Sequence, residues 1–372
     1  MTPSTLKTIE AQLMAPGTPF ALTREEVLGE TMEVFAQRAR SLRELLVASS
    51  QFGDVEYLVF SERRLTFAQH ARAAASVAQA LHERYGVGPG DRVAILAANC
   101  PEWIIAFWAT VSLGAIAVGF NGWWVGDEIR YALQDCTPKL LIADPKRLAR
   151  LPSSPTLPII TIPSQFQELI DYAPEAPWST VPIAEDDPAA LLYTSGTTGR
   201  PKGALSSHRN IIAMTGAQIF HGARAALLAQ AHTPPDRHDE ASNQGPSPLP
   251  PCGLVTTPLF HVSGLYAGAV TRLLVGSKTV WTTGRFNAET VMRLIEREKV
   301  TGWGPTGTML YRVLHHPKRT QYDLSSLNFV GLGGSAIDPA LVALARTTLP
   351  GATVAIGYGL TEGTAFSTLN WG

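Results

Sequence analysis

The chain has 372 residues, of which 45% are hydrophobic, so it is large and apolar enough to bury more than one core. Its formal net charge of −1 at pH 7 gives no composition-level support for binding nucleic acid or an anionic membrane surface. The three cysteines are far apart and odd in number, which argues against a disulfide framework or a zinc site and favours the reducing cytoplasm.

The first half of the chain predicts alternating strands and helices. Residues 1–20 have no apolar core flanked by basic residues, so no signal peptide is expected. Residues 103–120 form an uncharged run of 18 residues, close to the length of a membrane span. However, Pro101 favours a helix start, and Gly114 favours a helix stop. The expected neighbours are strands at 92–97, 115–119 and 139–143, and a helix at 127–135. This pattern is typical of a buried β-α-β-α-β unit, so no transmembrane segment is predicted.

A loop rich in glycine and hydroxyl groups follows an apolar run at 189–193. The apolar run predicts a buried strand that delivers the loop. Glycines allow backbone N–H groups to converge on a phosphate, hydroxyl groups donate hydrogen bonds, and the lysine adds a positive charge. The residues expected to hold phosphate are Thr194, Ser195, Gly196, Thr197, Thr198, Gly199 and Lys202. The P-loop of nucleoside triphosphatases does not fit, because Pro201 precedes the lysine and the chain should leave the loop extended.

The second half repeats the alternation of strands and helices. The expected strands are 254–257, 279–282, 300–303, 329–332 and 353–356. The expected helices are 265–274, 288–298, 308–315 and 339–346. The predicted fold class is therefore α/β, with two packed, doubly wound, mainly parallel sheets and helices on both faces. We expect a first subdomain at 1–185 and a second, carrying the ligand cleft, at 186–372, with a Pro-rich surface insert at about 232–251.

The loop at 193–203 resembles the phosphate loop of the AMP-forming adenylating superfamily, which includes acyl-CoA synthetases, luciferases and the adenylation domains of peptide synthetases. Segments 258–264, 331–335 and 357–362 resemble three further motifs of that family, in the same order. The resemblance runs from about Leu28 to the last residue and is closest to bacterial fatty-acyl-CoA ligases. It implies that ATP and Mg²⁺ activate a carboxylic acid, here expected to be a fatty acid, to acyl-AMP, and that CoA then accepts the acyl group.

The resemblance also implies roles for single residues. Lys202, Thr361 and Glu362 are expected to be catalytic, and Thr194 is expected to share Mg²⁺ with Glu362. The expected adenine-side residues are Gly333, Gly334, Ser335, Tyr358, Gly359 and Leu360. The expected acyl-pocket residues are His261, Trp303, Gly304 and Thr306, although ordinary core packing stays open for each of these four. A carboxylate is already ionised at pH 7, so its attack on the α-phosphorus needs positioning and charge neutralisation, and no general base.

Three features depart from the family pattern. Ile356 occupies a position where relatives usually have a polar side chain that hydrogen-bonds to the adenine amino group. Gly304 replaces a larger residue, which would widen or reroute the acyl pocket. The chain stops ten residues after Glu362, whereas full-length relatives continue into a mobile C-terminal lid domain that supplies a lysine and half of the CoA site. With the lid absent, we expect an incomplete CoA site and little acyl-CoA formation.

Two other functions stay open at this point. One is an adenylating enzyme that passes the acyl group to a carrier-protein thiol or to oxygen, and the other is a non-catalytic nucleotide- or acyl-binding module. Apolar residues around the expected acyl tunnel favour a fatty acid over an amino acid. The expected partners are a small carboxylic acid, ATP and CoA, with no nucleic acid. Peripheral membrane contact and a homodimer stay open.

Overall fold

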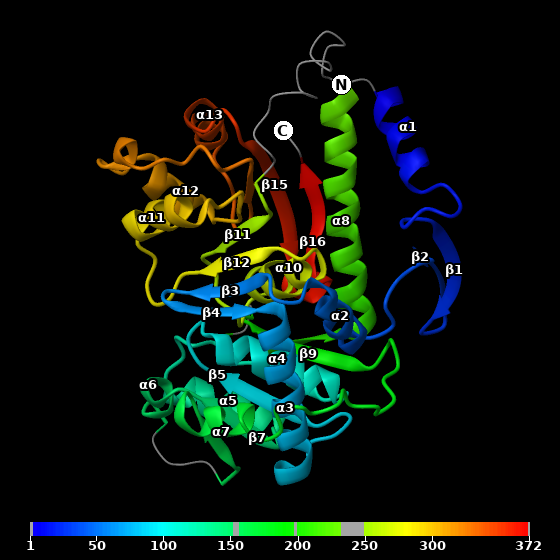
Figure 1. Ribbon diagram of the computed structural model, residues 1–372, viewed down its shortest axis with the longest axis vertical. Helices are drawn as coiled ribbons and strands as arrows, with labels where there is room; N and C mark the ends of the chain where they lie inside the picture. The colour runs from blue at the N-terminus through cyan, green and yellow to red at the C-terminus, as the bar shows by residue number, and fades with distance from the viewer. Residues whose placement is uncertain (1–2, 152–155, 197–198, 232–248, 371–372) are drawn as a thin grey trace.

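The computed structural model describes residues 3–151, 156–196, 199–231 and 249–370 (Figure 1). Two large sheets build the molecule. The first has six strands in the order β10-β9-β6-β5-β7-β8, and the second has eight in the order β16-β15-β14-β13-β11-β12-β3-β4. Most neighbouring strands are parallel, and helices pack against both sheets. The predicted α/β class with two mainly parallel sheets is confirmed.

The first sheet lies in the lower half of the view in Figure 1. Its strands are β5 (Arg92–Leu96), β6 (Ile116–Gly119), β7 (Leu140–Ala143), β8 (Ile159–Thr161), β9 (Pro188–Thr194) and β10 (Lys202–Ser207). Its helices are α3 (Phe67–Tyr85), α4 (Pro101–Ser112), α5 (Gly126–Cys136), α6 (Pro145–Leu148) and α7 (Ser164–Ile170). Every residue of α4 is buried, and so is every residue of β6. The uncharged run at 103–120 is therefore a buried helix followed by a buried strand, as predicted.

The second sheet carries helices on its two faces. Its strands are β3 (Glu56–Phe60), β4 (Arg63–Thr66), β11 (Cys252–Val255), β12 (Lys278–Trp281), β13 (Gly302–Trp303), β14 (Phe329–Leu332), β15 (Thr353–Leu360) and β16 (Ala365–Asn370). The helices that follow its strands are η3 (Ser263–Val270), α10 (Thr271–Leu274), α11 (Ala288–Glu298), α12 (Gly307–Leu314), η4 (Arg319–Gln321), α13 (Pro339–Thr348) and η5 (Thr361–Gly363). The helix expected at 265–274 is thus a π-helix that continues as a short α-helix.

The two sheets exchange strands across the predicted subdomain boundary. The β3–β4 hairpin, from the first half of the chain, pairs with β12 of the second sheet. Conversely, β9 pairs with β6, so the loop between β9 and β10 is built on the first sheet. Sheet membership therefore does not follow the predicted division into 1–185 and 186–372. The local pattern cannot reveal this exchange, because strand partners are set by packing between distant segments.

Successive residues in the second sheet face opposite sides. Trp303 and Val330 belong to a core with α11, α12 and α13, whereas Val255 packs with η3 and α10 in the larger core of the molecule. Several positions on this η3 side, on β11, β13 and the strands beside them, are glycine: Gly253, Gly302, Gly304, Gly331 and Gly357. Glycine inside a strand often marks a place where another group approaches the backbone closely.

An N-terminal segment lies along the long helix α8 (His208–Ala231). It comprises α1 (Pro3–Leu13), β1 (Leu22–Val27) and β2 (Glu30–Phe35), and it is followed by α2 (Leu42–Ala48) and η1 (Ser49–Phe52). The rings of Phe20 and Phe220 meet edge to face with centroids 5.4 Å apart, and Arg224 pairs with Glu10. By length and composition, α8 is apolar enough over His208–Leu228 to cross a membrane. Packed helices of folded domains share such a composition, and α8 contacts α1, α2 and β10.

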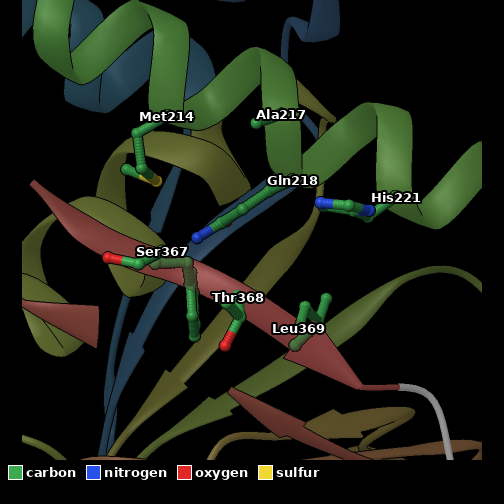
Figure 2. Close-up of a pocket in the computed structure, with 8 residues that line it drawn as sticks. Met214, Ala217, Gln218, His221, Ser367, Thr368 and Leu369 are labelled. Atoms are coloured by element: carbon green, nitrogen blue, oxygen red, sulfur yellow. The ribbon is translucent and has the colours of Figure 1, made fainter. Parts of the chain in front are cut away.

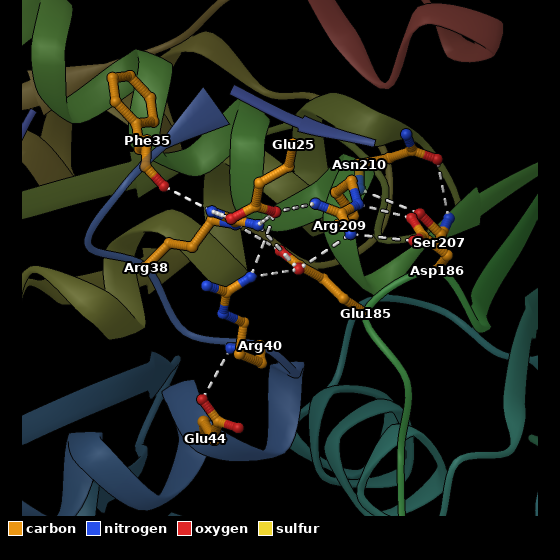
Figure 3. A network of polar contacts seen from close by, with 10 residues as sticks. All are labelled: Glu25, Phe35, Arg38, Arg40, Glu44, Glu185, Asp186, Ser207, Arg209 and Asn210. Atoms are coloured by element: carbon orange, nitrogen blue, oxygen red, sulfur yellow. Dashed lines mark hydrogen bonds and ion pairs between the residues drawn. The ribbon is translucent and has the colours of Figure 1, made fainter. Parts of the chain in front are cut away.

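A buried ion-pair network ties this N-terminal segment to the start of β9 and to α8 (Figure 3). Arg38 donates to Glu185 Oε2 at 2.9 Å and to Glu25 Oε2 at 2.6 Å. Arg209 pairs with Glu185 and Asp186. The hydrogen bond with Glu185 raises the pKa of Arg38. The network therefore holds the start of β9 in place, and β9 leads into the glycine- and hydroxyl-rich loop.

Candidate active site

The β9–β10 hairpin presents the predicted phosphate loop at its tip. Antiparallel register places Thr194 opposite Lys202, and Lys202 begins an extended strand as predicted. Gly196 has φ = 61°, and a Cβ there would lie 2.4 Å from the carbonyl oxygen of Arg200, so this position requires glycine. Gly199 has φ = 81°. The predicted backbone freedom of both glycines is confirmed. Thr197 and Thr198 lie outside the described residues, and Ser195 is exposed.

The segment 357–362 forms the end of β15 and the short helix η5. The predicted strand end at 356 is wrong, because pairing with β16 continues β15 to Leu360. Tyr358 is 64% exposed, so its ring is free to stack on a ligand. A Cβ on Gly359 would lie 1.4 Å from the carbonyl oxygen of Ala365, which excludes any other residue at this reversal of the chain. Thr361 and Glu362 are in η5, where Glu362 is exposed.

The loop and the η5 turn meet at the same place. The Oγ1 atom of Thr194 lies 3.4 Å from Oε1 of Glu362 and 3.4 Å from the backbone oxygen of Lys202. The side chains of Lys202 and Glu362 are both exposed. The Thr194 hydroxyl group and the Glu362 carboxylate thus meet at one exposed junction between the two sheets, beside the backbone of Lys202. This arrangement suits a ligand that carries several phosphate groups and a divalent cation.

The donor atoms at this junction fit magnesium. Mg²⁺ prefers oxygen ligands and takes one or two protein groups together with phosphates and waters. Glu362 and Thr194 offer a carboxylate and a hydroxyl oxygen side by side. Within the described ranges, no group of three or more His, Cys, Asp or Glu residues could hold a metal ion.

The predicted adenine-side turn lies beside the η5 segment. A Cβ on Gly333 would lie 3.0 Å from the carbonyl oxygen of Gly357, so the turn after β14 touches β15. Gly334 has φ = 79°, and Ser335 is exposed. The side chain of Ile356 packs into the core with α11 to α13, so it does not face the adenine side. The structure therefore brings the predicted turn next to Tyr358, and the adenine role of these residues stays a prediction.

The four predicted acyl-pocket residues do not gather at one surface. Trp303 is buried in the core, where its Nε1 donates to Thr256 Oγ1 at 3.1 Å, and its role in an acyl pocket stays a prediction. Gly304 is the next residue and faces the other side of the sheet, where the nearest heavy atom to a Cβ would be 3.9 Å away. Thr306 caps α12 by accepting from the N–H of Met309. The exposed backbone of Gly304, which no heavy atom approaches closely, is the feature that fits a substrate.

His261 belongs to the segment 258–264 and is half-buried. Its ring centroid is 4.6 Å from that of Phe260, and desolvation lowers its pKa, which keeps the imidazole neutral at pH 7. Phe260 also meets Trp123 edge to face at 5.3 Å, and Trp123 is 65% exposed. The sequence offers no motif for Trp123. Its position after β6 and its exposed aromatic ring are visible only in the structure.

Two cavities lie away from the predicted residues. One, of about 60 Å³, opens between α8 and β16 and is lined by the residues in Figure 2, among them Gln218 and His221. The other lies over the carboxyl ends of β5, β7 and β8, near Cys100 and Lys146. None of the predicted site residues lines either cavity. The candidate site is instead the exposed junction of Thr194, Lys202 and Glu362.

The chain also matches a known protein family over most of its length. Residues 46–372 match the family model described as AMP-binding enzyme. The chain belongs to the AMP-binding enzyme family. This match confirms the predicted superfamily.

Two curated relatives illustrate the match. The chain is similar to 4-coumarate–CoA ligase 2 of Oryza sativa subsp. japonica, with 30% identity over 322 residues, which cover 81% of this chain and 53% of that protein. It is also similar to feruloyl-CoA synthase of Amycolatopsis sp, with 30% identity over 298 residues, which cover 80% of this chain and 54% of that protein. The chain therefore spans about half the length of these curated relatives.

Solved structures share the fold. The N-terminal domain of FACL13 from Mycobacterium tuberculosis gives a TM-score of 0.72 at 24% identity, covering 89% of this chain and 78% of that chain. The anthranilate CoA ligase AuaEII, in complex with anthranoyl-AMP, gives a TM-score of 0.73 at 25% identity. The match covers 90% of this chain and 61% of that chain. These likenesses confirm the predicted architecture.

Proposed function

We propose that this chain is the large nucleotide- and acid-binding portion of an ATP-dependent, AMP-forming acid:CoA ligase. The observation that carries the proposal is the junction of Thr194, Lys202 and Glu362, where a hydroxyl group and a carboxylate from two sheets meet beside the backbone of Lys202. Membership of the AMP-binding enzyme family supports the same activity.

In this proposal the protein positions the reactants and neutralises charge. Lys202 and the N–H groups of the 194–202 loop hold the β- and γ-phosphates as pyrophosphate leaves. Glu362 and Thr194 hold Mg²⁺, which would neutralise charge that develops on the phosphates. Thr361 lies next to the α-phosphate, and Tyr358 stacks on adenine. The bound acid attacks as a carboxylate, so none of these residues has to remove a proton.

The acid lies over Gly304, on the face of the second sheet that η3 covers. The apolar side chains of η3 support an apolar acid, which includes the predicted fatty acid. The names of the relatives add aromatic acids to the candidates, namely 4-coumarate and ferulate. CoA is the proposed acceptor, because the names of these relatives describe CoA ligases and synthases. The cytoplasmic location and a homodimer stay predictions.

Calorimetric titration of Mg·ATP tests the nucleotide site. The wild-type chain should bind Mg·ATP, and Lys202→Ala should weaken binding about tenfold or more, since hydrogen bonds to charged groups are worth about 1.5–3 kcal/mol. Lys146→Ala, at an exposed lysine beside the distant cavity, is the matched control and should bind normally. Equal Mg·ATP affinity of the wild type and Lys202→Ala would refute the assigned site. Pyrophosphate release with fatty and aromatic acids would then identify the acid.

A further inference from the structure

The side chain of Arg272 lies over the second sheet. A Cβ built on Gly253 would be 2.8 Å from both Cζ and Nε of Arg272, and one built on Gly302 would be 3.1 Å from Nη2. Gly253 and Gly302 are register partners in the neighbouring strands β11 and β13. The two glycines therefore leave the space that the guanidinium group occupies.

The charge of this guanidinium group is not compensated by any neighbour in the described part of the chain. Among the residues that the structure describes, none forms an ion pair or a hydrogen bond with the Arg272 side chain. Desolvation lowers the pKa of Arg272. The side chain is nevertheless only half-buried, so it also borders accessible space. Burying a cation without a partner is costly, and an anion supplied from outside the protein would remove that cost.

The position of Arg272 relates it to the proposed acid site. Gly302 and Gly304 are two residues apart in one extended segment, so they face the same side of the sheet. Gly304 is exposed and lies nearer the carboxyl ends of the strands, and the nearest heavy atom to its Cβ position is 3.9 Å away. Thr306 is four residues beyond Gly302, a distance of roughly 13 Å at about 3.3 Å per residue. Arg272 thus lies at the amino ends of the strands, opposite the proposed nucleotide site.

We propose that Arg272 closes the inner end of the acid pocket and binds a second carboxylate at the far end of the substrate. The preferred substrate class is then a dicarboxylic acid, with one carboxylate activated and the other held by the guanidinium group. A guanidinium group pairs well with a carboxylate, because two parallel N–H groups can donate to its two oxygens. This inference rests on the proposed function and adds the substrate class to it.

Two acids with the same carbon chain test the inference. Decanoate carries one carboxylate and sebacate carries two. Each is titrated calorimetrically into the chain in the presence of Mg²⁺ and α,β-methylene-ATP, whose own binding is measured first. The wild type should bind sebacate at least about tenfold more tightly than decanoate, as expected for a charged hydrogen bond in a desolvated pocket. Arg272→Leu should reverse this preference, and Arg272→Lys should keep part of it.

Controls separate the possible outcomes. Arg312→Leu removes an arginine that lies over the Phe286 ring on the other face of the sheet, and it should leave the acid preference unchanged. Thermal melting shows whether each variant is folded. If the nucleotide analogue binds but sebacate shows no advantage, or if Arg272→Leu keeps the advantage, the inference about Arg272 is overturned while the proposed function stands. If neither the nucleotide analogue nor an acid binds to the wild type, the proposed function fails, and the inference fails with it.

Discussion

Thr194 and Glu362 are 168 residues apart in the sequence, yet Oγ1 of Thr194 lies 3.4 Å from Oε1 of Glu362. Thr194 ends β9 of the first sheet, whereas Glu362 follows β15 of the second sheet. The contact therefore joins the two sheets at the carboxyl ends of their strands. Ligands of α/β proteins bind at this kind of edge.

Removing the charge of Glu362 should weaken binding of the metal-loaded nucleotide. Glu362→Gln keeps the size of the side chain but loses the charge that attracts Mg²⁺, so we expect Mg·ATP affinity to fall about tenfold or more. Binding of ATP without Mg²⁺ should change little. Titrations with and without Mg²⁺ measure both values. Equal losses in the two titrations would contradict a metal-binding role for Glu362.

Trp303 and Gly304 should respond differently to substitution, because their positions face opposite sides of the sheet. Trp303→Ala should cost about 3–5 kcal/mol of unfolding free energy, since it leaves a cavity in the core. Gly304→Val should fill the open space, weaken acid binding and cost much less stability. Urea unfolding and acid titration measure the two effects. A Gly304→Val variant with wild-type acid binding would exclude this face as the acid pocket.

Arg38 should contribute strongly to stability. Its side chain is 6% exposed and that of Glu185 is 8% exposed, so Arg38→Leu leaves a buried carboxylate with fewer partners. We expect a loss of about 3 kcal/mol in urea unfolding. Arg24→Ala is the control, because Arg24 and Glu33 form an exposed pair 3.8 Å apart, and it should change stability by less than about 0.5 kcal/mol. Similar losses of unfolding free energy for both variants would show that burial of the network does not contribute to stability.

Stability should fall in acid because two histidines are buried in the neutral form. Burial lowers the pKa of His70 to about 3 and that of His208 to about 4, both from 6.5. Below pH 6.5 the unfolded chain takes up protons that the folded chain does not, so the unfolding free energy decreases as the pH falls toward these values. His70 alone should account for roughly 3 kcal/mol between pH 6.5 and about pH 4.

Unfolding of His70→Leu measured across this range should show a weaker pH dependence than the wild type. The exposed His315 provides the control, and His315→Leu should keep the wild-type profile. An unchanged profile for His70→Leu would mean that His70 is not the group that titrates.

Local patterns predict individual elements well where the caps are clear. The predicted helix 288–298 and the predicted strand 329–332 have the observed bounds of α11 and β14. Asn287 caps the start of α11, and Lys299 ends it in the left-handed conformation. In contrast, α8 and the β1–β2 hairpin were not predicted. Small and apolar residues are spread around α8, so no single face of it has a clear period.

Contacts between distant segments could not be predicted from local patterns. The motifs indicate the residues of the candidate site, but only the structure separates Trp303 from Gly304 and places Thr194 beside Glu362. Arg272 follows no motif. Its position becomes visible only when Gly253 and Gly302 are seen as partners in neighbouring strands.

A crystal structure with bound Mg·ATP would test the central proposal most directly. The account predicts that the β- and γ-phosphates lie against the loop from Thr194 to Lys202, with Mg²⁺ between them and the carboxylate of Glu362. Nucleotide density at the cavity between α8 and β16, or at any site that contacts neither Lys202 nor Glu362, would contradict it.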